Sequence, residues 1–358
     1  MKKYKIVIYG CGKDAKTLEE FIDEYGCVDI LYFVQTKKDR DEYHGFKVNN
    51  YDDIVWSELD YVVVATRKYY DDIKKVLCEN NADERKIIEL YSFMELVKKF
   101  KPNYSTCIAE NRLNYVYSSE DKFIGPFMKY SGRNHGDTMM KELLTLARRF
   151  FAFDDTGYFL DIGANIGTAS IYAKYLMPDI KVVGFEPSRQ NYNVYRCNCI
   201  LNDMEDIKTV NVGLGDVPSQ LGYSYMIDNP GGGYITDNAE KCTEMIHITT
   251  LDSYLEEQHI NPNDISFIWM DVEGFESEVI IGGRKTLSQK KIPMVQEFNP
   301  SYYVSKGKAD EYCKIMEECY DFFVDVRNIN LDALDIMPIS RLKEFVYSNE
   351  TQTDLFFF

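Results

Sequence analysis

The chain falls into two blocks in which short apolar runs alternate with amphipathic stretches. In the first block, apolar runs at 5–10, 28–35, 60–66 and 86–90 alternate with helical patterns, the first of which ends at Gly26. Strands that alternate with helices predict a parallel sheet with right-handed crossovers. Residues 1–95 are therefore expected to form a small Rossmann-like α/β domain.

The second block is longer and begins with a strand, a glycine turn and a helix over residues 158–176. Further strands are predicted by apolar runs in the C-terminal half: 181–187, 207–216, 265–276, 292–300, 321–327 and 353–358. An amphipathic helix is predicted at 136–153. Residues 135–358 are expected to form a doubly wound, mostly parallel sheet, and residues 96–134 a linker and connecting segment.

Composition and charge narrow the class of protein. The 358 residues are 45% hydrophobic and carry a net charge of −17, which is typical of a folded globular chain. A phosphate backbone would be repelled by this surface, and no basic stripe is evident, so nucleic acid is not expected as a partner.

The cysteines and the apolar runs indicate the compartment. Nine cysteines with no paired spacing favour free thiols in a reducing environment. The apolar run after the N-terminal lysines is too short for a signal peptide, and no run approaches the ~20 residues of a membrane span. A cytoplasmic protein is expected, and the sequence leaves open whether it forms a homo-oligomer.

Carboxylates recur at the ends of the strands of the second block, where an open parallel sheet binds its ligand. Asp161 precedes the glycine turn, Glu186 ends the next strand and Asp216 ends the one after. The negative charge of these carboxylates would disfavour binding of a pyrophosphate. S-adenosylmethionine suits it better: Asp161 would attract its ammonium, Glu186 its ribose hydroxyls, and Asp216 or the backbone beside it the adenine edge. Gly163 and Gly167 would let the backbone approach closely.

At this point the chain resembles a known family. The segments "FLDIGANIGTAS", "VVGFEPSRQNYNVYRCNCILN", "ITTLDSYL" and "FIWMDVEGFESEVIIGG" occur in this order over residues 135–358 and resemble the FkbM family of S-adenosylmethionine-dependent methyltransferases. The resemblance implies a class I methyltransferase sheet of seven strands with the last antiparallel, and methyl transfer to a hydroxyl oxygen, often on a sugar or polyketide.

These motifs give the expected cofactor-binding residues, namely Asp161, Gly163, Ala164, Asn165, Gly167, Glu186, Pro187, Asp216 and Asp271. One position departs from the family pattern, because Trp269 stands where the family usually has lysine. Any acceptor contact made by that lysine is in doubt.

The strands at 265–276 and 292–300 deliver the expected catalytic carboxylates Asp271, Glu273 and Glu297. One of them would act as general base toward the acceptor hydroxyl. Alternatively Asp271, Glu297 and Asn299 would hold a divalent cation such as Mg²⁺, since this oxygen-rich set suits it. A structural alternative is that Asp271 and Glu273 cap the following helix.

Two glycine-containing segments each allow more than one role. "GCGKDA" at 10–15 matches G-x-G-x-x-A, but Gln35 and Thr36 replace the acidic residue that would grip the ribose of NAD. The first domain would bind a sugar nucleotide or another small anion, or only support assembly. The glycine-rich segment 226–238 would close over the acceptor or be a plain hairpin tip.

The leading hypothesis is an O-methyltransferase acting on a sugar, nucleotide-sugar or surface-glycan precursor, that is, on a small-molecule or glycan acceptor. One alternative is a binding or scaffold protein whose methyltransferase half is inactive. The other is an NAD-dependent oxidoreductase that uses the first domain, which the absence of an acidic residue at the second strand disfavours.

Overall fold

The computed structural model describes residues 4–25, 28–66, 68–80, 82–98, 104–109, 112–326, 331, 333–349 and 351–358. The chain divides into two compact units, Met1–Asn103 and Tyr104–Phe358. The expected end of the first helix at Gly26 and residues 99–103 of the expected linker lie outside the described residues. Residues 104–134, expected to be a connecting segment, belong to the second unit.

The first unit is a six-stranded sheet in the order β3-β4-β2-β1-β5-β6, with all pairs parallel except β3 with β4. Its elements are, in chain order, β1 (Tyr4–Tyr9), α1 (Lys13–Tyr25), β2 (Val28–Gln35), β3 (Glu42–Tyr43), β4 (Phe46–Asn50), β5 (Tyr61–Val64), α2 (Tyr70–Glu79), β6 (Ile87–Glu89) and α3 (Leu90–Lys98). The four predicted strands are β1, β2, β5 and β6. The hairpin of β3 and β4 and the helix α3 were not predicted.

The strands of the first unit are apolar on both sides because helices cover both faces of the sheet. Ile6 and Ile8 pack with α1 and α3, whereas Val7 and Tyr9 pack on the opposite face with α2. The unit therefore has a core on each side of the sheet.

The second unit is built on an eight-stranded sheet in the order β11-β10-β9-β16-β17-β20-β18-β19. Its sheet strands are β9 (Tyr158–Ile162), β10 (Lys181–Phe185), β11 (Lys208–Val210), β16 (Ile265–Met270), β17 (Met294–Phe298), β18 (Phe322–Asp325), β19 (Met337–Pro338) and β20 (Thr353–Phe357). β20 runs antiparallel between β17 and β18, as expected. The expected count of seven strands was one short, because the two-residue β19 pairs with β18 at the edge.

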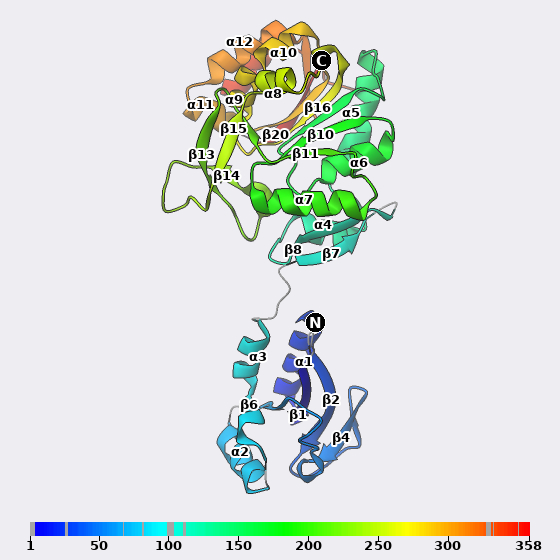
Figure 1. The fold of residues 1–358 in the computed structure, drawn as a ribbon, viewed down its shortest axis with the longest axis vertical. Coiled ribbons are helices and arrows are strands. Elements are labelled where there is room, and N and C mark those ends of the chain that lie inside the picture. The colour runs from blue at the N-terminus through cyan, green and yellow to red at the C-terminus, as the bar shows by residue number, and fades with distance from the viewer. Residues whose placement is uncertain are drawn as a thin grey trace. The chain divides into compact units, whose positions relative to one another are not determined.

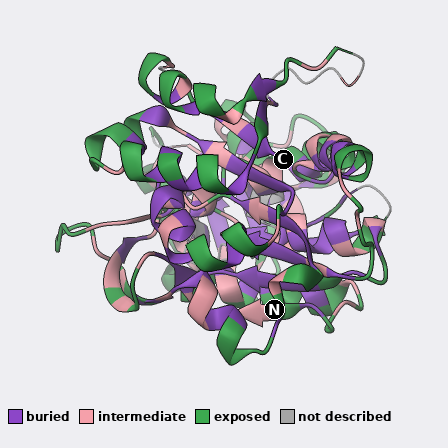
Figure 2. Cartoon of the chain, turned by 90° about the horizontal axis from the view of Figure 1, so that it is seen from above, coloured by how far each residue is buried: buried purple, intermediate pink, exposed green. Residues whose placement is uncertain are grey.

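Helices cover both faces of this sheet (Figure 1). The helices are α4 (Ile124–Ser131), α5 (Asp137–Phe150), α6 (Thr168–Leu176), α7 (Arg189–Leu201), α8 (Leu251–Glu257), α9 (Glu276–Gly282), α10 (Arg284–Gln289), α11 (Pro300–Ser305), α12 (Ala309–Cys319) and α13 (Leu342–Ser348). Phe159 and Phe267 pack with α5 to α7, whereas Leu160 and Ile268 pack with α8 to α12. Buried residues accordingly follow the strands and the inner helix faces (Figure 2).

Two smaller sheets complete the second unit. One is the hairpin β7 (Tyr104–Ile108) with β8 (Asn114–Ser118). The other, in the order β12-β15-β13-β14, holds β12 (Gly213–Leu214), β13 (Ser219–Ser224), β14 (Tyr234–Ile235) and β15 (Glu244–Thr249). Neither sheet was predicted.

The single strand expected at 207–216 is wrong, because the chain leaves the main sheet after β11. Asn211 lies between β11 and β12, and its Nδ2 donates to the carbonyls of Glu186 and Pro187 at 2.9 and 3.0 Å. β12 then pairs with β15 in the small sheet. The segment that carries Asp216 is thereby displaced from the edge formed by β9 and β10.

The eight cysteines among the described residues carry free thiols. Within the described part of the chain, no helix combines the length and apolar character that crossing a membrane requires.

Candidate functional site

A recess of about 560 Å³, partly open to solvent, lies at the carboxyl ends of the central strands of the second unit. The loop after β9 contributes Gly163 and Asn165, and the end of β10 contributes Glu186 and Pro187. Asp271 and Glu273, which follow β16, line the same recess. The carboxyl ends of β9, β10 and β16 thus meet at one site, as the parallel topology requires.

The turn after β9 depends on its two glycines for reasons of packing within the chain. Gly163 has φ +88°, and a Cβ there would lie 1.7 Å from the carbonyl oxygen of Asp271. Gly167 has φ +86°, and a Cβ there would lie 2.1 Å from the ring of Tyr195. The close approaches found at these glycines are therefore made by the protein itself.

Asp161 is buried and serves the architecture of this turn. Its Oδ2 accepts from the backbone N–H and the hydroxyl of Ser170 at 2.9 and 2.5 Å, which ties β9 to the first turn of α6. Burial raises the pKa of Asp161 to about 6, against the lowering effect of Ser170. Asp161, Ala164 and Gly167 are not among the residues that line the recess.

Glu186 is the buried carboxylate of the recess. Its two oxygens accept from the backbone N–H groups of Asn165 and Ser188, each at 2.8 Å. Burial nevertheless raises the pKa of Glu186 to about 8. Each carboxylate oxygen can accept further bonds, so Glu186 offers two fixed acceptors to a ligand.

Asn165 provides an unsatisfied acceptor beside Glu186. It has φ +50°, a left-handed conformation that Asn tolerates, and its N–H is held by Glu186. Its Oδ1 is buried and has no hydrogen-bond partner among the described residues. An acceptor buried without a donor is costly, which favours a ligand that donates to it.

The glycine-rich segment forms the wall of the recess opposite the turn. Pro230 is held by Asn191, whose Nδ2 donates to its carbonyl at 2.8 Å, and a Cβ at Gly231 would lie 2.9 Å from Nδ2 of Asn165. Gly231, Gly233 and Tyr234 line the recess. This segment thus packs beside Asn165 and the end of β10.

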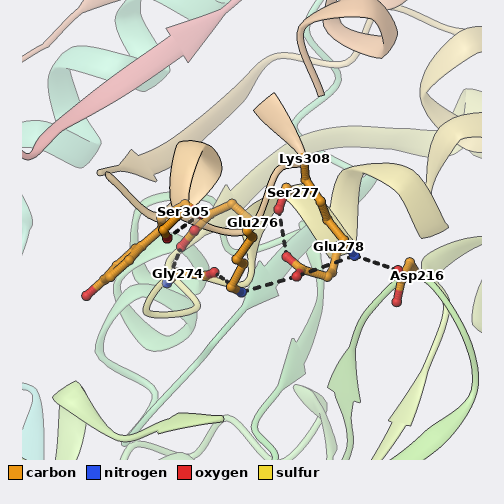
Figure 3. Close-up of polar contacts among 9 residues, drawn as sticks. Asp216, Gly274, Glu276, Ser277, Glu278, Ser305 and Lys308 are labelled. Atoms are coloured by element: carbon orange, nitrogen blue, oxygen red, sulfur yellow. Dashed lines mark hydrogen bonds and ion pairs between the residues drawn. The ribbon is translucent and has the colours of Figure 1, made fainter. Parts of the chain in front are cut away.

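Asp216 does not line the recess and is engaged elsewhere. Its Oδ2 pairs with Lys308 at 2.7 Å, and Lys308 also lies 3.5 Å from Glu278 of α9 (Figure 3). The backbone just before it contributes Gly213 and Leu214 to the recess instead. Of the two alternatives for the adenine edge, the structure places only the backbone at the recess.

The turn after β16 is strained and internally capped. Glu273 and Gly274 have φ values of +50° and +90°. Glu276 accepts from the N–H groups of Val272 and Gly274 at 3.3 and 3.2 Å, and burial raises its pKa to about 8. Glu276 thus fixes this turn, whereas α9, with Phe275 at its N-cap, has no side-chain cap hydrogen bond among the described residues. The expected capping of α9 by Asp271 and Glu273 is therefore wrong.

Asp271, Glu273 and Glu297 form a carboxylate trio, in which one oxygen of each lies within 4.8 Å of the others. Burial, and then the charge of Glu297, raise the pKa of Glu273 to about 7. Although Asp271 is exposed and Glu297 half-buried as whole residues, desolvation of their carboxyl groups raises the pKa of both, and the charges of Glu297 and Glu273 raise that of Asp271 further, well above its usual range. Three carboxylates this close cannot all be ionised without a compensating proton or cation.

Two neighbouring residues behave differently from the expectation. Oδ1 of Asn299 caps α11 by accepting from the backbone N–H and the hydroxyl of Ser301, at 3.2 and 2.6 Å. Trp269 packs against the core under α5, where a Cβ at Gly136 would lie 3.8 Å from its ring. The structure thus gives Asn299 a capping role and Trp269 a packing role.

Several residues of the recess were missed from the sequence, namely Asn191, Tyr223, Ile248, Val272 and Phe275. Phe275 and Val272 belong to the same motif as Asp271. Their closeness to Asp271 in the sequence could therefore have indicated that they line the recess. Tyr223 and Ile248 come from the small sheet, whose pairing the sequence did not reveal.

Comparisons with known proteins agree with this geometry. Residues 161–323 match the model of the methyltransferase FkbM domain, a range that begins near the end of β9 and includes β10, β16, β17 and the residues that line the recess. This part of the second unit is similar to FkbM methyltransferase domains, and we call it the FkbM domain. Residues 2–88 match a second family model, described as C2185-like, N-terminal.

Two curated relatives are methyltransferases by name. "Methyltransferase 1" of Beauveria bassiana (strain ARSEF 2860) is 22% identical over 148 residues, which are 36% of this chain and 59% of that protein. "Methyltransferase sdnD" of Sordaria araneosa is 36% identical over 75 residues, 21% of this chain and 29% of that protein. The chain thus spans less than two thirds of either relative.

Among solved structures, methyltransferase FkbM from Methylobacillus flagellatus KT is similar with 14% identity and a TM-score of 0.36, covering 100% of this chain and 90% of that one. The FkbM domain has the expected α/β architecture, a mostly parallel sheet covered by helices on both faces.

Proposed function

We propose that the FkbM domain uses S-adenosylmethionine bound in the recess to methylate a hydroxyl oxygen of a sugar or sugar-containing acceptor. Glu186 carries this proposal, because it presents a fixed carboxylate at the end of the strand beside the glycine turn. A ribose has two adjacent hydroxyl groups that donate to such a carboxylate.

The remaining lining of the recess supports the same ligand. No Lys or Arg is among its described lining residues, whereas three carboxylates are, Glu186, Asp271 and Glu273. A phosphorylated cofactor would lack counter-charge in this recess. The sulfonium and ammonium of S-adenosylmethionine are cationic, and its amino groups offer donors to the unsatisfied Oδ1 of Asn165.

Glu273 is the proposed general base. S-adenosylmethionine supplies an electrophilic methyl group on a sulfonium, which leaves as a neutral thioether when the carbon–sulfur bond breaks. Glu273 accepts the proton of the acceptor hydroxyl as the new carbon–oxygen bond forms. A pKa of about 7 suits this role at neutral pH. Asp271 and Glu297 would hold the acceptor's other hydroxyl groups or share a proton.

A divalent cation remains a proposal for the carboxylate trio. Oxygens of Asp271, Glu273 and Glu297 converge closely enough to hold Mg²⁺, whereas Asn299 is committed to α11. Such an ion would lower the pKa of the acceptor hydroxyl. This role is an alternative to proton transfer by Glu273: if the ion activates the hydroxyl, removal of metal with EDTA abolishes methyl transfer and added Mg²⁺ restores it. Unchanged activity in EDTA would leave the carboxylates to act alone.

The proposal is tested by methyl transfer itself. Purified protein would be incubated with methyl-labelled S-adenosylmethionine and a panel of monosaccharides and nucleotide-sugars. The expected product carries the label as an O-methyl ether, identified by mass spectrometry and NMR. If the protein binds the cofactor but transfers label only to a nitrogen, carbon or sulfur acceptor, O-methylation is wrong. If it binds no cofactor, the alternative of an inactive scaffold is favoured.

A further inference from the structure

A second recess, of about 910 Å³ including open solvent, lies in the first unit. It is formed at the carboxyl ends of β1, β2 and β5 and at the start of α1. β1 lies between β2 and β5, so the chain crosses to opposite sides of the sheet at this strand. Open parallel sheets bind ligands at such a switch point.

The glycine turn under this recess has space that the protein does not fill. Gly10 has φ +107°, which explains glycine at that position. Gly12 has no such requirement, and a Cβ there would meet no atom within 4 Å. Since Gly12 lines the recess, its missing side chain leaves volume for a ligand next to the first turn of α1.

Two cationic groups line the recess without a partner among the described residues. No described carboxylate forms an ion pair with Lys13 or Lys37. Their neighbours Lys16 and Lys38, by contrast, pair with Glu20 at 3.7 Å and Asp41 at 2.7 Å. Asp14 is the one carboxylate among the described lining residues, so two lysines against one carboxylate leave a net positive charge beside the start of α1, in a chain of net charge −17.

A buried hydroxyl group adds a neutral donor. Tyr9 is 3% exposed, and its Oη lies 2.6 Å from Oγ1 of Thr36. The two hydroxyl groups carry two protons but share one hydrogen bond, so one proton is free for a ligand. Gln35 accepts through its Oε1 from the N–H of Asp39 at 3.1 Å, and this bond does not use its Nε2 donor.

These observations select among ligands. The recess is much larger than a single phosphate needs, and its wall includes Tyr69, an aromatic residue that is 50% exposed and has Nζ of Lys68 5.1 Å from its ring centroid. No carboxylate ends β2, where NAD would need one for its ribose.

We propose that the recess of the first unit binds a nucleoside diphosphate, free or linked to a sugar, with its phosphates at the start of α1 between Lys13 and Lys37. This site is separate from the methyltransferase recess, and its occupation does not depend on the function proposed for that recess.

The test is calorimetric titration of the full chain with UDP, CDP, ADP, GDP, UDP-glucose and inorganic phosphate. At least one diphosphate should bind with a Kd below about 1 mM. The double variant Lys13→Ala, Lys37→Ala should weaken it by roughly tenfold or more, since two charge-assisted contacts are lost. The matched control Lys16→Ala, Lys38→Ala should change Kd less than about twofold, because those exposed lysines lie outside the recess.

A third variant guards against misfolding. Gly12→Val should block binding and change the melting temperature little, since a Cβ there would have no atom within 4 Å. The proposal is overturned if no diphosphate binds, if binding survives loss of both lysines, or if inorganic phosphate binds as tightly as the best diphosphate. Tighter binding of UDP-glucose than of UDP would identify the sugar-linked form as the ligand.

Discussion

At the residue scale, the two carboxylates on which the proposed function depends most, Glu186 and Glu273, lie in different surroundings. Backbone N–H groups fix Glu186 at the side of the recess, where it offers acceptors. Glu273 lies in a left-handed turn among other carboxylates, with a pKa of about 7. The first is suited to binding and the second to proton transfer.

The variant Glu273→Gln should lower kcat by a factor of about 100 or more, because it removes the general base. In the parent, a base of pKa about 7 is protonated below that pH, so kcat should fall roughly tenfold per pH unit below 7 and level off above 8. Rate measurements from pH 5.5 to 9 check this. A flat profile in the parent, or an active Glu273→Gln, would assign the base elsewhere.

Glu186 makes a separate prediction about protons. With a raised pKa of about 8, it is mostly protonated at pH 7 in the free protein. Ribose hydroxyls that donate to it stabilise the ionised form and lower its pKa, so binding should release a proton. Titration with S-adenosylhomocysteine in phosphate and in Tris at pH 7 should therefore give different apparent enthalpies. Equal enthalpies in the two buffers would show that Glu186 does not change its protonation.

At the element scale, the glycine turn after β9 and the turn after β16 are fitted to each other. The carbonyl oxygen of Asp271 lies where the Cβ of a side chain at position 163 would be. The turn after β9 and the turn after β16 therefore fix each other's position. Lys306 stabilises the turn after β16. Its Nζ donates to the carbonyl of Gly274 at 2.6 Å and pairs with the buried Glu278 at 3.1 Å. Disturbing either turn should disturb both.

The variant Gly163→Ala should destabilise the second unit by about 3 kcal/mol, the sum of a left-handed conformation and an overpacked contact. Gly307→Ala is the matched control: Gly307 has φ +66° with no atom near its Cβ position, so about 1 kcal/mol is expected. Urea unfolding followed in each variant checks the difference. Equal losses would mean that the contact with Asp271 relaxes freely.

The element scale also shows what the sequence could reveal. Strands buried on both faces, such as β9 and β16, are mostly apolar and were predicted together with the carboxylates near their ends. The small sheet was missed because its two-residue strands are specified by partners far along the chain. Asp216 was misjudged for the same reason, because its partner Lys308 is 92 residues away. Asp161 was expected to contact the ligand because the motif does not reveal that Ser170 donates a hydrogen bond to its carboxylate.

At the scale of the whole molecule, two α/β units each carry a recess at the carboxyl edge of a parallel sheet, and the two recesses differ in charge. The recess of the FkbM domain is lined by carboxylates, whereas that of the first unit has two lysines and one carboxylate, Asp14. A cationic methyl donor and an anionic nucleotide, the ligands proposed for these recesses, are complementary to the two linings.

The most direct test of this account is calorimetric titration of the full chain with S-adenosylhomocysteine, comparing the parent with Glu186→Gln. Glu257→Gln is a matched control, since Glu257 lies exposed at the end of α8 and does not line the recess. We expect one site per chain in the parent and the control, and binding weakened by roughly tenfold or more in a folded Glu186→Gln. Binding that is absent in the parent, or unchanged in Glu186→Gln, would contradict the assignment of the cofactor to this recess.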